Sequence, residues 1–197
     1  MNSKLIAIIL FFIPFAPLVA AEWTFPIENR GDAGFRKLGH PGNQWDTWYG
    51  SRYWIGSNWT RVGRDWQHPD EETPSVRTFT AGRDGRATVT GHVYKAHQDA
   101  STDGVRVFLR HNDQVLWEAE IDGADGEGAK HDLTLDLKKG DRLRFIVHKR
   151  DKIFCDTTHW DPVIAFADGE TYRASDDFSP TDQGKRNWSY ECLSDGD

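Results

Sequence analysis

Tryptophan is the residue type whose spacing first indicates binding chemistry in this chain. Aromatic rings stack on the apolar faces of sugar rings, and the indole N–H adds a hydrogen-bond donor. The aromatic residues concentrated in residues 45–66 are Trp45, Trp48, Tyr49, Tyr53, Trp54, Trp59 and Trp66. Because residues 22–75, which contain this cluster, are also rich in Gly, Asn and Pro and show little periodicity, we interpret the cluster as a loop surface that binds a glycan. The alternative for each ring is burial, since large aromatic side chains mostly pack.

Basic residues form a second candidate binding surface. They recur at alternate positions of two apolar–polar segments and are Arg106, Arg110, Arg142, Arg144 and His148. Alternate side chains of a strand share one face, so these residues predict a positive face if the two strands share a sheet, and His92 and Tyr94 would join it from a third strand. Guanidinium forks bind carboxylates and sulfates bidentately, which would suit an acidic polysaccharide. The alternative is a solvated face on which outward acids pair with the arginines for little stability.

Signatures of catalysis are sparse. The sequence lacks a GxSxG elbow, an HExxH motif and a phosphate-binding Gly-rich loop. A polysaccharide lyase needs a base and a group that neutralises a uronate carboxylate, and His148 with Arg142 or Arg144 offers these residue types. Since the match rests on residue type alone, a lyase or a glycoside hydrolase is an alternative to a binding function.

Residues 155–164 form a polar segment, CDTTHWDPVI, that contains the candidate metal ligands Asp156 and Asp161. Asp and Thr either hydrogen-bond to their own backbone in turns or ligate hard cations. The spacing matches no specific metal motif, so a structural turn and a structural Ca²⁺ site are the two hypotheses. We expect no other cofactor.

The elements that must position these residues are strands. Apolar and polar residues alternate in segments 88–94, 105–110, 133–137 and 142–148, residues 114–121 form another candidate strand, and Gly, Asn and Asp lie between these segments. A period of two with short turns and no helical period predicts an all-β fold, an antiparallel β-sandwich of jelly-roll type. The predicted core positions are Val89, Val93, Val105, Val107, Leu109, Val115, Trp117, Ile121, Leu133, Leu135, Leu137, Leu143, Phe145 and Val147.

The N-terminal segment predicts export. Residues 1–21 carry one Lys, an apolar run and a small-residue end, which is the pattern of a cleaved signal peptide. Residues 22–197 then form a single domain, secreted or periplasmic, with Trp-rich N-terminal loops. The apolar run is short and contains two prolines, so we expect no transmembrane segment. A net charge of −7 argues against generic nucleic-acid binding.

Two cysteines, Cys155 and Cys192, are the whole complement of the chain. In an exported protein the simplest prediction is one disulfide, which would pin the C-terminal tail to the domain. A loop of this length would give about 3–4 kcal/mol of stabilisation in the chain-entropy model. The alternative, a reactive thiol pair, lacks a CxxC motif.

The order of several short motifs resembles a known class of module. These motifs are Asp103-Gly104-Val105-Arg106-Val107, Val115-Leu116-Trp117, Lys139-Gly140-Asp141-Arg142-Leu143 and Asp156-Thr157-Thr158-His159-Trp160-Asp161-Pro162. Residues 40–166 thereby resemble the carbohydrate-binding-like β-sandwich modules of secreted bacterial glycan-processing proteins. The resemblance implies a jelly-roll sandwich, association with a glycan, and a separate glycan-degrading enzyme as a partner. Residues 183–190 resemble a further element of such modules, so the tail either completes this domain or begins a second one.

These observations lead to one preferred function and two alternatives. We expect a secreted carbohydrate-binding protein that recognises a polysaccharide, in particular an acidic one. A lyase or hydrolase on a β-sandwich is the first alternative, and a structural interaction domain of the cell envelope is the second.

Overall fold

The computed structural model describes residues 35–41 and 47–193, whose strands form two antiparallel sheets. Sheet A has six described strands. In spatial order they are β1 (Phe35–Lys37), β15 (Trp188–Leu193), β6 (Ser75–Thr80), β11 (Arg142–Lys149), β8 (Val105–His111) and β9 (Gln114–Ile121).

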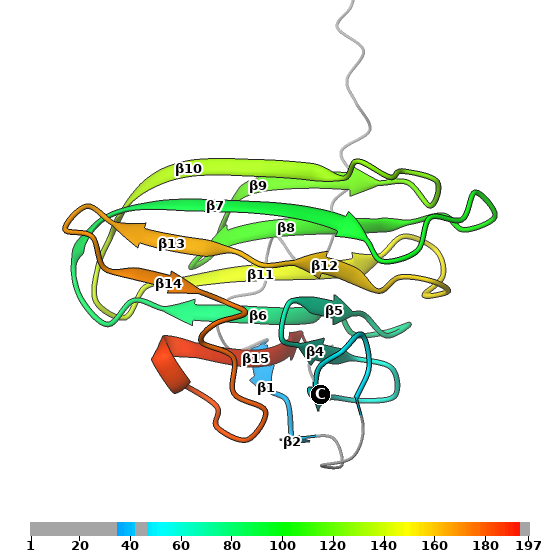
Figure 1. The fold of residues 1–197 in the computed structure, drawn as a ribbon, viewed down its shortest axis with the longest axis horizontal. Coiled ribbons are helices and arrows are strands. Elements are labelled where there is room, and N and C mark those ends of the chain that lie inside the picture. Colours follow the sequence, from blue (N-terminus) through cyan, green and yellow to red (C-terminus); the bar gives the residue numbers. More distant parts are fainter. Residues whose placement is uncertain (1–34, 42–46, 194–197) are drawn as a thin grey trace, which may run out of the picture.

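Sheet B has nine described strands and faces sheet A across the core. Its path runs through β14 (Thr171–Arg173), β13 (Val163–Phe166), β7 (Gly85–Lys95), β12 (Thr158–Trp160), β5 (Trp66–His68), β4 (Arg61–Gly63), β3 (Tyr53–Ile55) and β2 (His40–Pro41). The remaining strand, β10 (Ala129–Leu137), pairs with β7. The long strands lie side by side along the longest axis of the molecule (Figure 1). The predicted all-β sandwich is therefore confirmed.

The five predicted segments all become strands, and their apolar faces meet between the sheets. Of the predicted core residues, the ten that are buried there are Val89, Val93, Val105, Val107, Leu109, Ile121, Leu137, Leu143, Phe145 and Val147. Trp117, Leu133 and Leu135 are partly buried and pack against the same core. Val115 is the exception, because it packs against Phe108 and Ile146 in a small cluster separate from the main core. The β8–β9 ladder shifts register between Leu109 and Arg110, which moves Val115 out of step with Trp117.

Strand β7 divides sheet B into two branches, and this division positions the candidate site. On one side β7 pairs with β10 along most of its length. On the other side its first half pairs with β13 and its end pairs with β12. Asp161 and Pro162 connect β12 to β13. On this side the sheet opens, because neither strand pairs with the middle of β7 at residues 91–92.

The C-terminal segment completes this domain. Residues 185–187 form the 3-10 helix η2 (Lys185–Asn187), and β15 then inserts between β1 and β6 of sheet A. Trp188 and Tyr190 of β15 are fully buried in the core. The tail is thus an integral strand of the sandwich.

The predicted disulfide is wrong, since Cys155 and Cys192 are both free thiols. Cys192 lies on β15 in sheet A and packs in the core, opposite Ser75 of β6. Cys155 lies in the loop that leads into β12 of the other sheet. The β15 ladder, rather than a covalent bond, attaches the tail.

The predicted signal peptide, residues 1–21, lies outside the described residues. Within residues 35–41 and 47–193, no helix is long and apolar enough to cross a membrane.

Candidate functional site

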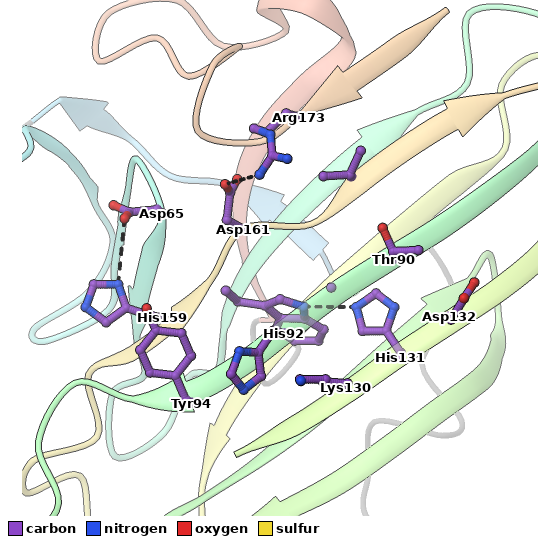
Figure 2. Close-up of a pocket in the computed structure, with 13 residues that line it drawn as sticks. Asp65, Thr90, His92, Tyr94, Lys130, His131, Asp132, His159, Asp161 and Arg173 are labelled. Atoms are coloured by element: carbon purple, nitrogen blue, oxygen red, sulfur yellow. Dashed lines mark hydrogen bonds and ion pairs between the residues drawn. The ribbon is translucent and has the colours of Figure 1, made fainter. Parts of the chain in front are cut away.

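A pocket of about 590 Å³ lies where sheet B opens over β7. Its lining combines the outward side chains of β7 and β10 with residues from β12, β14 and the turn before β5. Figure 2 shows His92, Tyr94 and His159 grouped on one side, with Lys130 and Asp132 projecting from β10. The lining of the pocket is mixed in charge, with three carboxylates, two cations and three imidazoles beside apolar and aromatic side chains.

The floor of the pocket is fixed by a buried hydrogen bond between two rings. Nε1 of Trp160 donates to Nε2 of His131 at 3.1 Å, and Nδ1 of His131 lies 3.1 Å from the carbonyl of Val89. Burial lowers the pKa of His131, which keeps its ring neutral and able to accept through Nε2. A Cβ on Gly91 would lie 2.3 Å from that Nε2, so glycine is required for the ring to approach β7 so closely.

One wall of the pocket is a hydrogen-bonded cluster of polar residues around Asp161. Its carboxylate accepts from Nη1 of Arg173 at 3.0 Å and from the hydroxyl and backbone N–H of Ser175, each at 2.8 Å. These contacts tie the turn after β12 to β14. Asp161 and Arg173 are therefore largely committed to each other and to the fold.

The opposite side of the pocket is formed by a stack of rings. Tyr94 and His159 are stacked with their ring centroids 5.2 Å apart, and His92 lies 5.0 Å from Tyr94. Nδ1 of His159 faces Oδ2 of Asp65 at 3.8 Å, which is too long for a hydrogen bond (Figure 2). Tyr94 is 37% exposed and therefore offers ring surface to a ligand.

The ring stack continues from the pocket across β12 into the Trp-rich segment. Tyr49 contacts His159 at 6.0 Å, Trp48 contacts Tyr49 at 5.2 Å, and Trp59 contacts Trp48 at 6.4 Å between ring centroids. We name this surface the aromatic row and define it as Trp59, Trp48, Tyr49, His159, Tyr94 and His92. All six rings are partly or well exposed, and Trp59 at one end is 52% exposed.

A tight turn holds the centre of the aromatic row. Trp48 and Ser51 exchange both backbone hydrogen bonds, and the two residues between them, Tyr49 and Gly50, have φ values of 48° and 73°. Two consecutive positive φ values are those of a type I′ hairpin turn, which glycine tolerates and tyrosine adopts only under strain. The strained residue is the one whose ring reaches His159.

Trp66 supports this turn from below and does not itself reach the surface. It is fully buried, and its Nε1 donates to Oγ of Ser51 at 2.9 Å. A Cβ on Gly63 would lie 2.1 Å from the Trp66 ring, so β4 needs glycine at this position. Trp54 is also buried, with Nε1 bonded to the carbonyl of Ser179 at 2.8 Å. The expectation that these two tryptophans are exposed to a ligand is therefore wrong.

The predicted aromatic surface is thus divided into exposed and buried rings. Trp48, Tyr49 and Trp59 lie on the aromatic row, whereas Trp45 lies outside the described residues. Tyr53 is partly exposed and contacts Trp48 at 6.5 Å. Aromatic content alone did not separate these groups, because buried and exposed rings share one short segment.

The predicted basic face is not a solvated surface. Arg110 and Arg144 are buried, and Nε of Arg144 lies 3.4 Å from Oε2 of Glu191. The guanidinium of Arg144 also stacks over the Phe35 ring at 3.9 Å, because β1 brings that ring beside sheet A. The prediction of an exposed arginine face is wrong at these two positions.

The other members of the predicted basic face are half-buried and lie on sheet A. Nε of Arg106 pairs with Glu120 at 2.8 Å, and His148 lies opposite Arg106 in the β8–β11 ladder. Arg142 begins β11 and is also half-buried. His92 and Tyr94 do not join this face, because β7 belongs to sheet B.

The candidate catalytic residues Arg142, Arg144 and His148 all lie on β11 of sheet A, and none of them lines the pocket. Nδ1 of His148 is hydrogen-bonded to the carbonyl of Lys149. The structure therefore does not bring these three residues to the pocket in sheet B.

Each of the two candidate metal ligands, Asp156 and Asp161, forms an ion pair with a cationic side chain. Oδ1 of Asp156 contacts Nζ of Lys95 at 3.0 Å with both side chains fully buried, and burial raises the pKa of Asp156 to about 7. Asp161 is paired with Arg173 in the hydrogen-bonded cluster described above. Among the residues that the structure describes, no group of three or more His, Cys, Asp or Glu is arranged to hold a metal ion. Calcium binding stays a prediction.

Sequence reasoning missed several of the site residues. His159 lies in the segment that the sequence predicts to be a turn or a metal site, in which Asp156 and Asp161 are the only candidate ligands. Lys130 and Asp132 precede the alternation of residues 133–137. Extending that alternation backwards would have placed Lys130 and Asp132 on the outward face. No sequence signal predicts that β4, β5 and β12 meet beside β7.

No protein-family model matches the chain, and no curated protein matches it. Among solved structures, the chain is similar to one described as the native structure of a family 35 carbohydrate binding module from Clostridium thermocellum. The two share 11% identity with a TM-score of 0.33, over 68% of this chain and 89% of that chain.

Proposed function

We propose that this protein is a carbohydrate-binding protein that holds a polysaccharide along the aromatic row and in the pocket at its end. The observation that carries the proposal is the unbroken sequence of exposed ring contacts from Trp59 to His92 on one face of sheet B. Sugar rings present apolar faces that stack on aromatic rings. A row of rings suits an extended chain of sugars better than a single one.

The pocket supplies the polar half of such recognition. Sugar hydroxyls donate to carboxylates and accept from cationic and imidazole N–H groups. Asp132 and Lys130 are exposed at the pocket, while Thr90 lies beside them on β7. The rings would therefore supply affinity, and these polar groups would orient the sugar at the pocket.

The proposal includes a location and a ligand class that rest on the sequence. The apolar segment at residues 5–19 supports export from the cytoplasm. The arginines on which the sequence-based preference for an acidic glycan depends lie on β8 and β11 of sheet A, and none of them belongs to the aromatic row. A separate glycan-degrading enzyme as partner stays a prediction.

The test is a binding screen of the purified protein against soluble neutral and acidic polysaccharides, by affinity electrophoresis and calorimetry. Wild-type protein is expected to be retarded by at least one polysaccharide. Trp59→Ala is expected to weaken that retardation, whereas Phe154→Ala serves as the control because Phe154 is 67% exposed and belongs to no ring contact of the aromatic row. Equal retardation of wild type and Trp59→Ala would argue against the aromatic row.

The same samples separate binding from catalysis. Reducing ends and absorbance of unsaturated products are measured after prolonged incubation with each polysaccharide. Retardation without new ends supports a binding protein, and new ends would assign an enzyme. If neither binding nor turnover is found with any polysaccharide, the proposal fails, and a structural interaction domain of the cell envelope becomes the preferred hypothesis.

A further inference from the structure

Arg61 occupies an unusual place beside the open end of the aromatic row. It lies on β4, and its guanidinium carbon is 4.6 Å from the ring centroid of Trp59, 5.6 Å from that of Trp48 and 5.8 Å from that of Tyr53. Three rings thus hold one guanidinium group in place. Cation–π contacts of this kind favour a fixed orientation of the planar group.

The charge of Arg61 is not neutralised by a carboxylate within residues 35–41 and 47–193. Its one described hydrogen bond runs from Nη1 to the carbonyl of Asn58 at 3.2 Å. Other arginines of the domain are engaged with acids, as Arg83 is with Asp168 and Glu170. The remaining N–H groups of Arg61 are therefore available as donors at a partly exposed position.

The polar residues near Arg61, which are His68 and Asp70, do not form ion pairs with it. His68 lies directly opposite it in the β4–β5 ladder, and burial lowers the pKa of this imidazole to about 4, so the ring is neutral at pH 7. The buried carboxylate of Asp70 accepts from the backbone N–H of Trp59 at 3.2 Å and from Nδ2 of Asn58 at 3.3 Å. Asp70 thereby holds the loop that carries Trp59.

We propose that Arg61 and Trp59 form a subsite for an acidic sugar of the bound polysaccharide. The sugar ring packs on the exposed surface of Trp59, and the oxygens of its carboxylate or sulfate group accept hydrogen bonds from the free N–H groups of Arg61. Guanidinium is the side chain best suited to this geometry, because its parallel donors match two oxygens of one anionic group. The inference rests on the proposed polysaccharide-binding function and assigns its charge preference.

The rest of the molecule makes such a local cation necessary for binding an acidic glycan. The chain carries a net charge of −7, which repels polyanions at long range. The pocket holds more carboxylates than cations. A preference for acidic sugars therefore has to come from a cation that is placed beside the stacking rings. Arg61 is so placed at the Trp59 end of the aromatic row, whereas Lys130 at the pocket end lacks the guanidinium fork.

The experiment compares affinities for three matched oligosaccharides, one neutral, one containing uronate and one carrying sulfate esters. It uses wild type, Arg61→Gln, Arg61→Lys and the control Arg86→Gln. Arg86 lies exposed on β7, eight residues before Tyr94 and thus about 26 Å away along the strand. Arg86→Gln removes the same charge from the domain without touching the aromatic row.

The expected result is a loss in Arg61→Gln on the order of tenfold or more in affinity for the acidic oligosaccharide, with little change for the neutral one. Arg61→Lys is expected to be intermediate, because it keeps the charge and loses the fork, and Arg86→Gln is expected to match wild type. The two acidic ligands identify whether a carboxylate or a sulfate is the preferred anion.

Each of the following results would overturn the inference. If wild type binds neutral and acidic oligosaccharides equally, or if Arg61→Gln keeps the wild-type ratio of affinities, Arg61 does not select charge even though the polysaccharide function stands. If wild type binds none of the three oligosaccharides and no polysaccharide, both the function and the subsite fail. Loss of neutral and acidic binding together in Arg61→Gln, with altered near-ultraviolet circular dichroism, would assign Arg61 a purely structural role.

Discussion

The ring of Tyr94 stacks on the ring of His159, with centroids 5.2 Å apart and planes inclined by 23°. The two residues lie directly opposite each other in the β7–β12 ladder. This pair joins the pocket over β7 to the tryptophans carried by the β3–β4 and Trp48–Ser51 turns. Without β12 in this position, the pocket and the aromatic row would be separate surfaces.

The first prediction concerns the exposed rings. Tyr94→Ala is expected to weaken polysaccharide binding by about 1 kcal/mol, roughly fivefold in affinity, because one stacking contact is lost. The melting temperature is expected to change little, since Tyr94 is exposed. Calorimetric titration and a thermal melt of the same variant measure both quantities.

The matched control for this prediction is Trp54→Ala, which removes a buried ring. That variant is expected to lose about 3–5 kcal/mol of unfolding free energy, as large core truncations do. A large drop in the melting temperature of Tyr94→Ala, comparable with that of Trp54→Ala, would show that Tyr94 is a structural residue.

The second prediction concerns the support beneath the row. Gly63→Ala places a Cβ 2.1 Å from the ring of Trp66, which is fixed by its hydrogen bond to Ser51. Overpacking of this kind is expected to destabilise the protein by about 1–3 kcal/mol in urea unfolding and to weaken glycan binding by displacing Trp48 and Tyr49. Gly39→Ala is the control, because nothing lies within 4 Å of the added Cβ. Equal stability of the two variants would contradict the packing described here.

The third prediction concerns pH. Burial lowers the pKa of His68 from 6.5 to about 4 in the folded state, so the unfolded chain binds the proton more readily between these values. His68 therefore contributes stability that is present above pH 6.5 and is lost as the pH falls toward 4, by about 3 kcal/mol. Asp156, whose pKa is raised to about 7, acts in the opposite direction over the same range.

Because the two groups oppose each other, the informative quantity is the difference between wild type and His68→Gln. Urea unfolding at several pH values from 4 to 8 measures it. The stability of wild type relative to His68→Gln is expected to fall as the pH is lowered. A difference that is independent of pH would mean that His68 titrates normally in the folded protein.

The fourth prediction concerns the cysteines. The purified, unreduced protein is expected to show two titratable thiols after denaturation and an unchanged melting temperature on addition of a reductant. Half-buried Cys155 is expected to react with a thiol reagent before buried Cys192, which becomes accessible only on unfolding. A single disulfide in the mass spectrum, with no titratable thiol, would contradict the structure.

The sequence predicted the strands at 88–94, 105–110, 114–121, 133–137 and 142–148 and nearly all of their inward residues. It could do so because the period of two directly reflects which side chains leave water. The same rule failed at Val115, where a register shift in the β8–β9 ladder changes the face, and alternation carries no mark of such a shift.

The exposure of each outward residue was decided by tertiary structure. Sequence identified Trp48, Tyr49 and Trp59 as candidates but could not separate them from Trp54 and Trp66, because all are aromatic residues in one loop-rich segment. Sequence placed Arg144 on a solvent-exposed face, whereas the pairing of β1 with β15 brings the Phe35 ring over the guanidinium of Arg144. The sequence by itself determined which residues alternate and therefore the two-sheet sandwich. The contacts between strands that are distant in the chain decided which outward faces remain open, because exposure depends on what other segments lie against a face.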